Sequence, residues 1–353
     1  MTDPVVLFFT GLVGMALGSF LNVCVARWPR GGSVVRPRSA CPACSATIRG
    51  HDQIPVVSWF LLRGRCRKCR ARVSLCYPLV ETVGAAICVL VVLTRGVSLE
   101  AVGAAFFLLL LLGIALTDAR FYLIPDQFSL GGAAAGLALS LAPGGITPGD
   151  AAAGAVVGFG GMWLVGTTGT WVLARARPGR LEDAAREHDQ GRRRTRNARG
   201  VRILTRPRGQ LAALLPALPV MVLAGWWFGP VGVAAAVAAS AFGLAVLVAW
   251  VEGLAAPAHP DDSAPAPVAP GAVLGGGDVK MMALVGAFTG PWGAVLTVFL
   301  AALAGLLAYL KLRLLVGTRH LVPLGVFLAV GAAVTLWWGE ALLDWYLGLS
   351  GLT

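Results

Sequence analysis

The stretch AVGAAFFLLLLLGIALT, residues 101–117, contains no charged residue and ends immediately before Asp118. At 1.5 Å per residue, an apolar helix of this length can cross the hydrocarbon core of a membrane. Similar runs recur along the chain, and the further spans that we expect cover residues 5–26, 77–94, 127–142, 151–174, 211–228, 231–251, 279–310 and 322–339. The sequence therefore predicts an all-α polytopic membrane protein.

The composition excludes a water-soluble globular protein. Apolar residues make up 57% of the chain, charged residues make up 13%, and the mean hydropathy is +0.76. A soluble domain carries about a quarter charged residues, so most of this surface must face lipid. The net charge of +12 does not indicate nucleic acid, because the basic residues stand in short blocks between apolar runs.

The run 279–310 is too long for one ordinary helix across a core of about 30 Å. Gly290-Pro291 is the natural place to divide it. This division gives about ten transmembrane helices, with both chain ends on the same side of the membrane. The runs 211–228 and 231–251 could instead form a re-entrant hairpin.

The basic residues define an orientation. All but one of the 29 Lys and Arg residues fall on one face or at its border, and the exception is Arg95. An excess of Lys and Arg marks the cytoplasmic face. The segments that we expect there are 27–76, 118–126, 175–210, 252–278 and 311–321.

Two of these segments have unusual compositions. Residues 175–208 hold twelve arginines, which favour anionic lipid head groups as a partner. They do not favour nucleic acid, because no aromatic residues are interleaved with them. Residues 253–271 are rich in Ala and Pro and are typical of a flexible tether. The expected division of the chain is a first span (1–26), a cytoplasmic four-cysteine segment (27–76), spans carrying Asp118 (77–174), an inserted region (175–270) and the last spans (271–353).

Four cysteines form two CxxC pairs, Cys41/Cys44 and Cys66/Cys69. Tetrahedral zinc is bound by four thiolates, and a CxxC pair supplies two of them from one tight turn. Disulfides are rare on the cytoplasmic side, and so small a segment has few apolar residues with which to build a core. The spacing therefore predicts a structural zinc site.

Ionisable residues at membrane depth are costly and are candidates for function. Here they are Glu81, Asp118, Asp126, Glu252, Asp278 and Lys280. Asp118 and Asp278 fall on the same side of the membrane and can meet. A helix from Val279 to Gly290 is only about 18 Å long, so Asp278 should lie below the membrane surface.

The glycines before Asp278, among them Gly275 and Gly277, would let another helix or an extended substrate approach closely. Two facing carboxylates in a cavity are the minimum apparatus for aspartyl proteolysis, since close like charges keep one ionised and one protonated. From the residues alone, a protease, an ion-coupled transporter and a structural membrane adaptor all remain open.

The other ionisable residues have less specific interpretations. Asp126 follows Pro125 and precedes a helical run, which favours helix capping over catalysis. Glu81 lies close enough to the interface to reach water. Lys280 is expected either to reach the interface or to pair with a carboxylate, where it could tune the charge of the aspartate pair.

The chain resembles the type IV prepilin peptidases, the bacterial GxGD membrane aspartyl proteases. The matching blocks, in the order of that family, are Gly18-Ser-Phe-Leu-Asn22, Arg27-Trp-Pro29, Cys41 to Cys44, Asp52 to Trp59, Leu62 to Cys69, Tyr77-Pro78, Thr117-Asp118, Ile124-Pro125-Asp126, Gly275-x-Gly277-Asp278-Val-Lys280 and Val322 to Gly331.

The resemblance implies a function. Asp118 and Asp278 would be the catalytic pair of a peptidase in the bacterial inner membrane. It would remove the basic leader from prepilins or pseudopilins, after a glycine and on the cytoplasmic side. Many members also methylate the new N-terminus with S-adenosylmethionine. Residues 178–270 depart from the family, in which this stretch is short; eight spans would be family-like and the hairpin added.

Overall fold

The computed structural model describes residues 3–176, 246, 274–316 and 323–350. The hairpin at 211–228 and 231–251, most of the Arg-rich loop and the Ala/Pro tether lie outside the described residues. The expected count of ten spans therefore stays a prediction.

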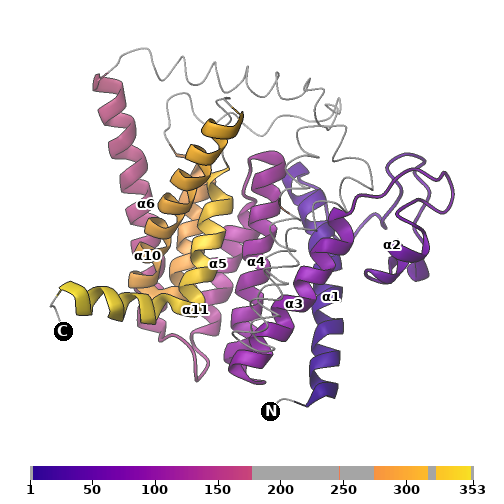
Figure 1. Ribbon diagram of the computed structural model, residues 1–353, viewed down its shortest axis with the longest axis horizontal. Coiled ribbons are helices and arrows are strands. Elements are labelled where there is room, and N and C mark those ends of the chain that lie inside the picture. Colours follow the sequence, from indigo (N-terminus) through magenta and orange to yellow (C-terminus); the bar gives the residue numbers. More distant parts are fainter. Residues whose placement is uncertain (1–2, 177–245, 247–273, 317–322, 351–353) are drawn as a thin grey trace. The chain divides into compact units, whose positions relative to one another are not determined.

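The described part of the chain is helical and has no strand (Figure 1). The long helices are α1 (Pro4–Arg27), α3 (Cys76–Arg95), α4 (Leu99–Phe121), α5 (Asp126–Leu139), α6 (Pro148–Ala176), α10 (Gly276–Val316) and α11 (Leu324–Ser350). The segment between α1 and α3 contains the short helices η1 (Trp28–Arg30), η2 (Gly50–Gln53) and α2 (Val57–Leu61). Six helices in the described residues are long and apolar enough to cross a membrane. The chain is an all-α, multi-pass membrane protein, as its sequence predicts.

Helices form here because lipid offers no partner to a backbone N–H or C=O group, so each segment must satisfy its own. The predicted break in the long run 279–310 is confirmed. Gly290 has a φ of 73°, outside the helical region, and Pro291 follows it within α10. Glycine adopts this φ without steric cost, and proline cannot donate a helical hydrogen bond.

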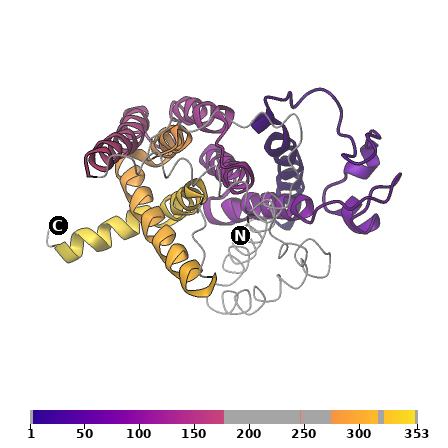
Figure 2. The same cartoon turned by 90° about the horizontal axis from the view of Figure 1, so that it is seen from above.

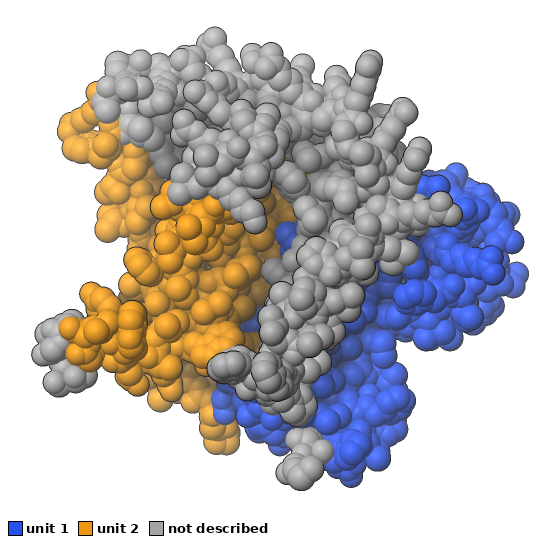
Figure 3. All heavy atoms as spheres, viewed as in Figure 1, with its two compact units in different colours: residues 1–109, 198–256 blue, residues 110–197, 257–353 orange. Residues whose placement is uncertain are grey.

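The chain divides into two compact units, coloured separately in Figure 3. The first unit consists of Met1–Leu109 and Ala198–Ala256, and the second of Leu110–Asn197 and Pro257–Thr353. In the first unit α1 packs along α3, and in the second α10 packs against α5, α6 and α11. Figure 2 shows α6 and α10 side by side.

Glycines allow the closest helix contacts in both units. In the first unit, a Cβ atom on Gly14 would lie 2.5 Å from the carbonyl oxygen of Gly84. In the second, a Cβ on Gly158 would overlap the carbonyl oxygen of Met282, and one on Gly154 would overlap that of Gly286. Without a hydrophobic force between helices in lipid, such backbone approach supplies the packing energy.

The contact between α6 and α10 predicts a position-specific effect of alanine on stability. Gly158→Ala should lower the free energy of unfolding by about 1–3 kcal/mol, because its methyl group must displace the α10 backbone. Gly160→Ala on the same helix meets open space and should be neutral or slightly stabilising. Thermal unfolding of the detergent-solubilised variants, followed by circular dichroism, measures both. Equal midpoints for the two variants would contradict this packing.

Candidate functional site

Asp118 lies in the last turn of α4 and is buried, with 7% of its surface exposed. Its neighbour Thr117 is fully buried, and its hydroxyl donates to the carbonyl oxygens of Gly113 and Ile114, both at 3.0 Å. The Oδ2 atom of Asp118 is buried and has no hydrogen-bond partner among the described residues. A buried polar atom without a partner is costly, so it marks a place where a ligand or water is expected.

Asp278 lies in the first turn of α10 and is partly buried. Its N–H donates to the carbonyl oxygen of Gly275 at 3.1 Å. A Cβ atom on Gly275 would lie 3.1 Å from Asp278 Oδ2, and one on Gly277 would lie 3.0 Å from the Cβ of Ile124. The two motif glycines therefore leave room for the Asp278 carboxyl on one side and for Ile124 on the other.

Contacts within the second unit bring the two aspartates together. A Cβ atom on Gly325, at the start of α11, would lie 2.8 Å from Asp118 Oδ2 and 3.1 Å from the Cδ1 of Ile124. Ile124 thus lies between Gly277, next to Asp278, and Gly325, next to Asp118. The carboxyl groups of Asp118 and Asp278 are near enough for their charges to interact. The chemical role of this pair stays a prediction.

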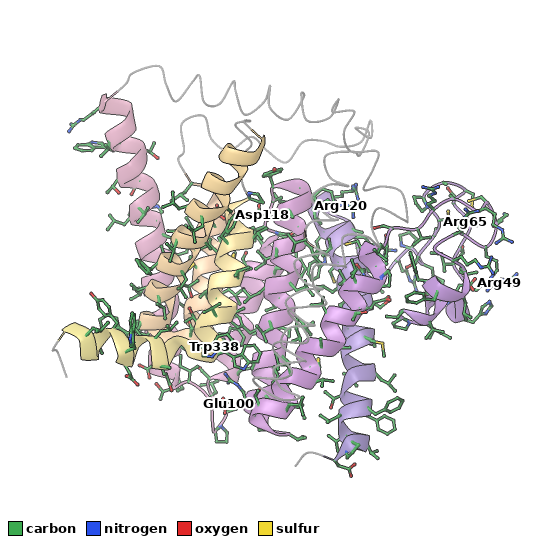
Figure 4. All side chains as sticks on the ribbon, in the orientation of Figure 1. Arg49, Arg65, Glu100, Asp118, Arg120 and Trp338 are labelled. Carbon is green, nitrogen blue, oxygen red and sulfur yellow. The ribbon has the colours of Figure 1, made fainter. Side chains whose placement is uncertain are left out.

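Figure 4 shows Asp118 and Arg120 near the end of α4. The two residues are two positions apart, about 200° around a helix, so they do not share a face. Arg120 stacks on the Phe121 ring, with its Cζ 5.7 Å from the ring centroid. The last turn of α4 therefore presents Asp118 and Arg120 on different sides.

Asp126 does not cap α5 as the sequence suggested. It is the first residue of the helix, and no side chain caps this end. Its carboxylate instead accepts from Lys280 Nζ at 2.7 and 2.9 Å. This ion pair joins the first residue of α5 to α10, two residues after Asp278. It therefore fixes the end of the Ile124 turn that leads into α5.

Three buried residues were not identified from the sequence as site residues. Gly325 and Ile124 are apolar, and only the packing of α11 and of the turn before α5 reveals that Gly325 lies against both Asp118 and Ile124. Glu81 was expected to reach water, but it is 7% exposed and its Oε2 accepts from the N–H of Val56 at 2.6 Å. In the sequence, Glu81 is only a lone carboxylate in an apolar run, and such a pattern does not indicate which residue will bond to it.

The second cluster, in the first unit, is built from two copies of one turn. In the first copy, Cys41 N–H donates to Ala46 at 2.9 Å and Ala40 pairs with Thr47. In the second, Cys66 N–H donates to Ala71 at 2.8 Å and Arg65 pairs with Arg72. The residue after the second cysteine of each turn, Ser45 or Arg70, has a positive φ. Each turn therefore presents its two thiols to the same side.

The four sulfur atoms of Cys41, Cys44, Cys66 and Cys69 all lie within 4.8 Å of one another. Hydrogen bonds from the backbone N–H groups of Cys69 and Lys68 lower the pKa of the Cys66 thiol to about 6. A thiolate is the form that binds metals. This cluster can hold a metal ion.

Comparison with known proteins gives one family match and several relatives. Residues 12–95 match the Bacterial Peptidase A24 N-terminal domain, which here corresponds to most of α1, the cysteine segment and α3. The chain is 38% identical over 156 residues to the prepilin leader peptidase/N-methyltransferase of Myxococcus xanthus. It is 31% identical over 187 residues to that of Neisseria gonorrhoeae and 38% identical over 122 residues to that of Bacillus subtilis.

The match to the Myxococcus xanthus protein covers 44% of this chain and 47% of the relative. The corresponding shares are 46% and 65% for the Neisseria gonorrhoeae protein and 35% and 48% for the Bacillus subtilis protein. The chain thus spans less than two thirds of the length of each. No solved structure matches. The resemblance to prepilin peptidases that the sequence motifs indicated is confirmed.

The Lys280–Asp126 pair predicts rescue by charge exchange. Lys280→Asp or Asp126→Lys alone places like charges together, whereas the double variant restores an ion pair of opposite polarity. With side chains 37% and 57% exposed, the pair should contribute about 0.2–1 kcal/mol. Thermal unfolding of the two single variants and the double variant measures this. If the double variant loses as much stability as the two single variants lose together, the pairing is contradicted.

Proposed function

We propose that this protein is a membrane aspartic endopeptidase that cleaves the leader peptide from type IV prepilins or pseudopilins. The main support is the Asp118–Asp278 pair, which combines a buried oxygen atom without a described partner and a second carboxyl close by. The names and similarity of the relatives point to the same substrate class.

The proposed reaction uses the two carboxyl groups in different protonation states. Two close carboxyls share one proton, because both cannot be ionised together in a site of low dielectric. The ionised group takes a proton from water, and the water oxygen bonds to the carbonyl carbon of the scissile peptide. The protonated group donates to the carbonyl oxygen. Collapse of this tetrahedral intermediate breaks the C–N bond, and the proton taken from water goes to the leaving amine. One hydroxyl returns its proton to the other carboxyl as the C=O bond re-forms.

Small residues around the pair suit an extended peptide. Gly275 and Gly277 precede Asp278, and Gly325 lies against Asp118. A peptide backbone must come within hydrogen-bonding distance of both carboxyls to react, and glycine leaves room for that approach. Ile124, which lies beside Gly277 and Gly325, adds an apolar wall for the peptide.

We infer that the active site faces the cytoplasm in the bacterial inner membrane. The support is the positive-inside pattern of the Lys and Arg residues. The aspartates and the cysteine cluster all lie in or next to the segments that the sequence assigns to the face carrying nearly all the Lys and Arg residues. Leader peptides of the resembled family are basic and are cut on this side.

We further propose that the cysteine cluster binds zinc. Four ligands at the usual Zn–S distance of about 2.3 Å, placed tetrahedrally, stand about 3.8 Å apart. The sulfur atoms of Cys41 and Cys69 are 3.7 Å apart. When bound, zinc would link the two turns and stabilise a segment that has little apolar core.

The names of the relatives also include an N-methyltransferase activity. N-methylation with S-adenosylmethionine is a second proposed activity of the same chain. In the described part of the chain, no group of residues is recognisable as a binding site for this cofactor.

Alanine at either aspartate should abolish cleavage of a co-expressed prepilin. Asp118→Ala and Asp278→Ala should each lower the rate at least about 100-fold, because the proton transfers then lose their donor or acceptor. Asp126→Ala should reduce it less. Processing is measured from the size of the prepilin on immunoblots of membranes that contain equal amounts of each variant.

Asp150→Ala is the matched control, because Asp150 is an exposed carboxylate that accepts from the hydroxyl of Thr147 at 2.7 Å. It should cleave at the wild-type rate. Full cleavage by the Asp278→Ala protein would contradict the proposal. Substrate- or ion-dependent uptake into vesicles, lost in the same variants, would favour the alternative of an ion-coupled transporter.

Metal analysis of the purified protein should find about one zinc ion per chain. Cys44→Ser should release it and expose the 41–72 segment to proteases. Cys88→Ser, which changes a buried thiol of α3, should retain the metal. Wild-type protein with no zinc, and with its cysteines paired as disulfides, would contradict both the site and its cytoplasmic location.

A further inference from the structure

The short helix α2 turns an apolar face outward. Val57, Phe60 and Leu61 are 49%, 61% and 76% exposed, and Ile54 just before the helix is 49% exposed. Positions 57, 60 and 61 follow the i, i+3, i+4 spacing of one helix face. In a segment with few apolar residues, this outward placement is unexpected for a surface that faces water.

The opposite face of α2 is firmly held. Ser58 is buried and its hydroxyl donates to the carbonyl oxygen of His51 at 3.0 Å. The indole N–H of Trp59 donates to the carbonyl oxygens of Val73 and Ser74, both at 3.2 Å. The orientation of the outward face is therefore fixed by α2's own hydrogen bonds.

Glu81 sets the depth of α2 relative to the membrane span that follows it. Its carboxylate accepts from the N–H of Val56, the residue before α2. The 20 residues of α3 extend about 30 Å, which equals the thickness of the hydrocarbon core. Glu81 is five residues after Cys76 and so lies about 7.5 Å along the span from its start, and Val56 is one glutamate side chain away from it. Interfacial helices place their apolar face about 5–10 Å into the boundary between head groups and acyl chains.

The charge of the surrounding segment fits an anionic membrane surface. Its one acidic residue is Asp52, whose carboxylate accepts from both Nε and Nη2 of Arg67. This bidentate pair holds the pKa of Asp52 below its usual value. Figure 4 shows Arg49 and Arg65 on the segment. The basic residues between positions 27 and 76 are Arg27, Arg30, Arg36, Arg38, Arg49, Arg63, Arg65, Arg67, Lys68, Arg70 and Arg72.

We propose that α2 inserts its apolar face, Val57, Phe60 and Leu61 with Ile54, into the membrane leaflet at the start of α3. The arginines of the segment bind anionic lipid head groups around it. The Glu81–Val56 hydrogen bond holds α2 at this depth. The cysteine segment is thereby a lipid-bound domain, and its metal-binding turns are carried at the membrane surface.

Photocrosslinking of the full-length protein in nanodiscs tests this. Leu61→p-benzoylphenylalanine places the probe on the apolar face of α2. Thr47→p-benzoylphenylalanine places it at an exposed, uncharged position of the first cysteine turn as the matched control. After irradiation, mass spectrometry should find lipid adducts at position 61 in at least about fivefold excess over position 47. Raising phosphatidylglycerol from none to about 30% should increase the yield at position 61 severalfold. Metal content equal to that of the wild type verifies that each variant is folded.

Other outcomes would overturn the proposal. Equal lipid adducts at both positions would mean that α2 is not specifically inserted. Adducts at position 61 to a second copy of the chain would identify a protein interface instead. Replacement of the lipid adducts by an added prepilin peptide would identify a substrate-docking surface. A yield at position 61 that does not respond to phosphatidylglycerol would remove the role of the arginines.

Discussion

The approach of α6 to α10 through glycine is the contact on which the second unit depends. At Gly154 and Gly286 the two backbones touch with no side chain between them, and α10 also packs against α5 and α11. In lipid, where helices gain nothing by hiding apolar surface, this contact supplies van der Waals energy that a larger residue would remove. This contact fixes the position of α10 within the unit. It therefore also fixes the position of Asp278, which lies in the first turn of α10.

Around the aspartates, the two carboxyl groups of the pair are kept apart from the nearby Lys280 ammonium group. Asp118 and Asp278 approach one another beside Gly325 and Ile124, whereas Lys280 turns away and pairs with Asp126. Asp278 and Lys280 are two positions apart, about 200° around the helix, so their side chains lie on different faces of α10. A cation is thus kept near the site without neutralising it directly. Lys280 thus fixes the start of α5 to α10 through Asp126.

The cysteine segment has little apolar core, so other contacts must hold its shape. Two similar turns bring four thiols together, Trp59 packs on Gly64, and Glu81 reaches from α3 to hold Val56. Each of these contacts is polar or local. The large apolar side chains of α2 are consequently free to face outward, where lipid rather than protein can cover them.

Much of this protein could be predicted from its sequence, because the membrane makes apolar length and charge position directly informative. Uncharged runs gave the helices and Gly290-Pro291 gave the break in α10, since each depends on residues close together in the chain. The CxxC pairs gave the sulfur cluster, because two such pairs are typical of a single metal site. The partners of isolated polar groups could not be predicted in this way. The pairing of Asp126 with Lys280, the burial of Glu81 against Val56 and the contact of Gly325 with Asp118 join residues that are far apart in sequence. Only the packing of helices decides them, because a carboxylate or a glycine can be accommodated in many ways until its neighbours are in place.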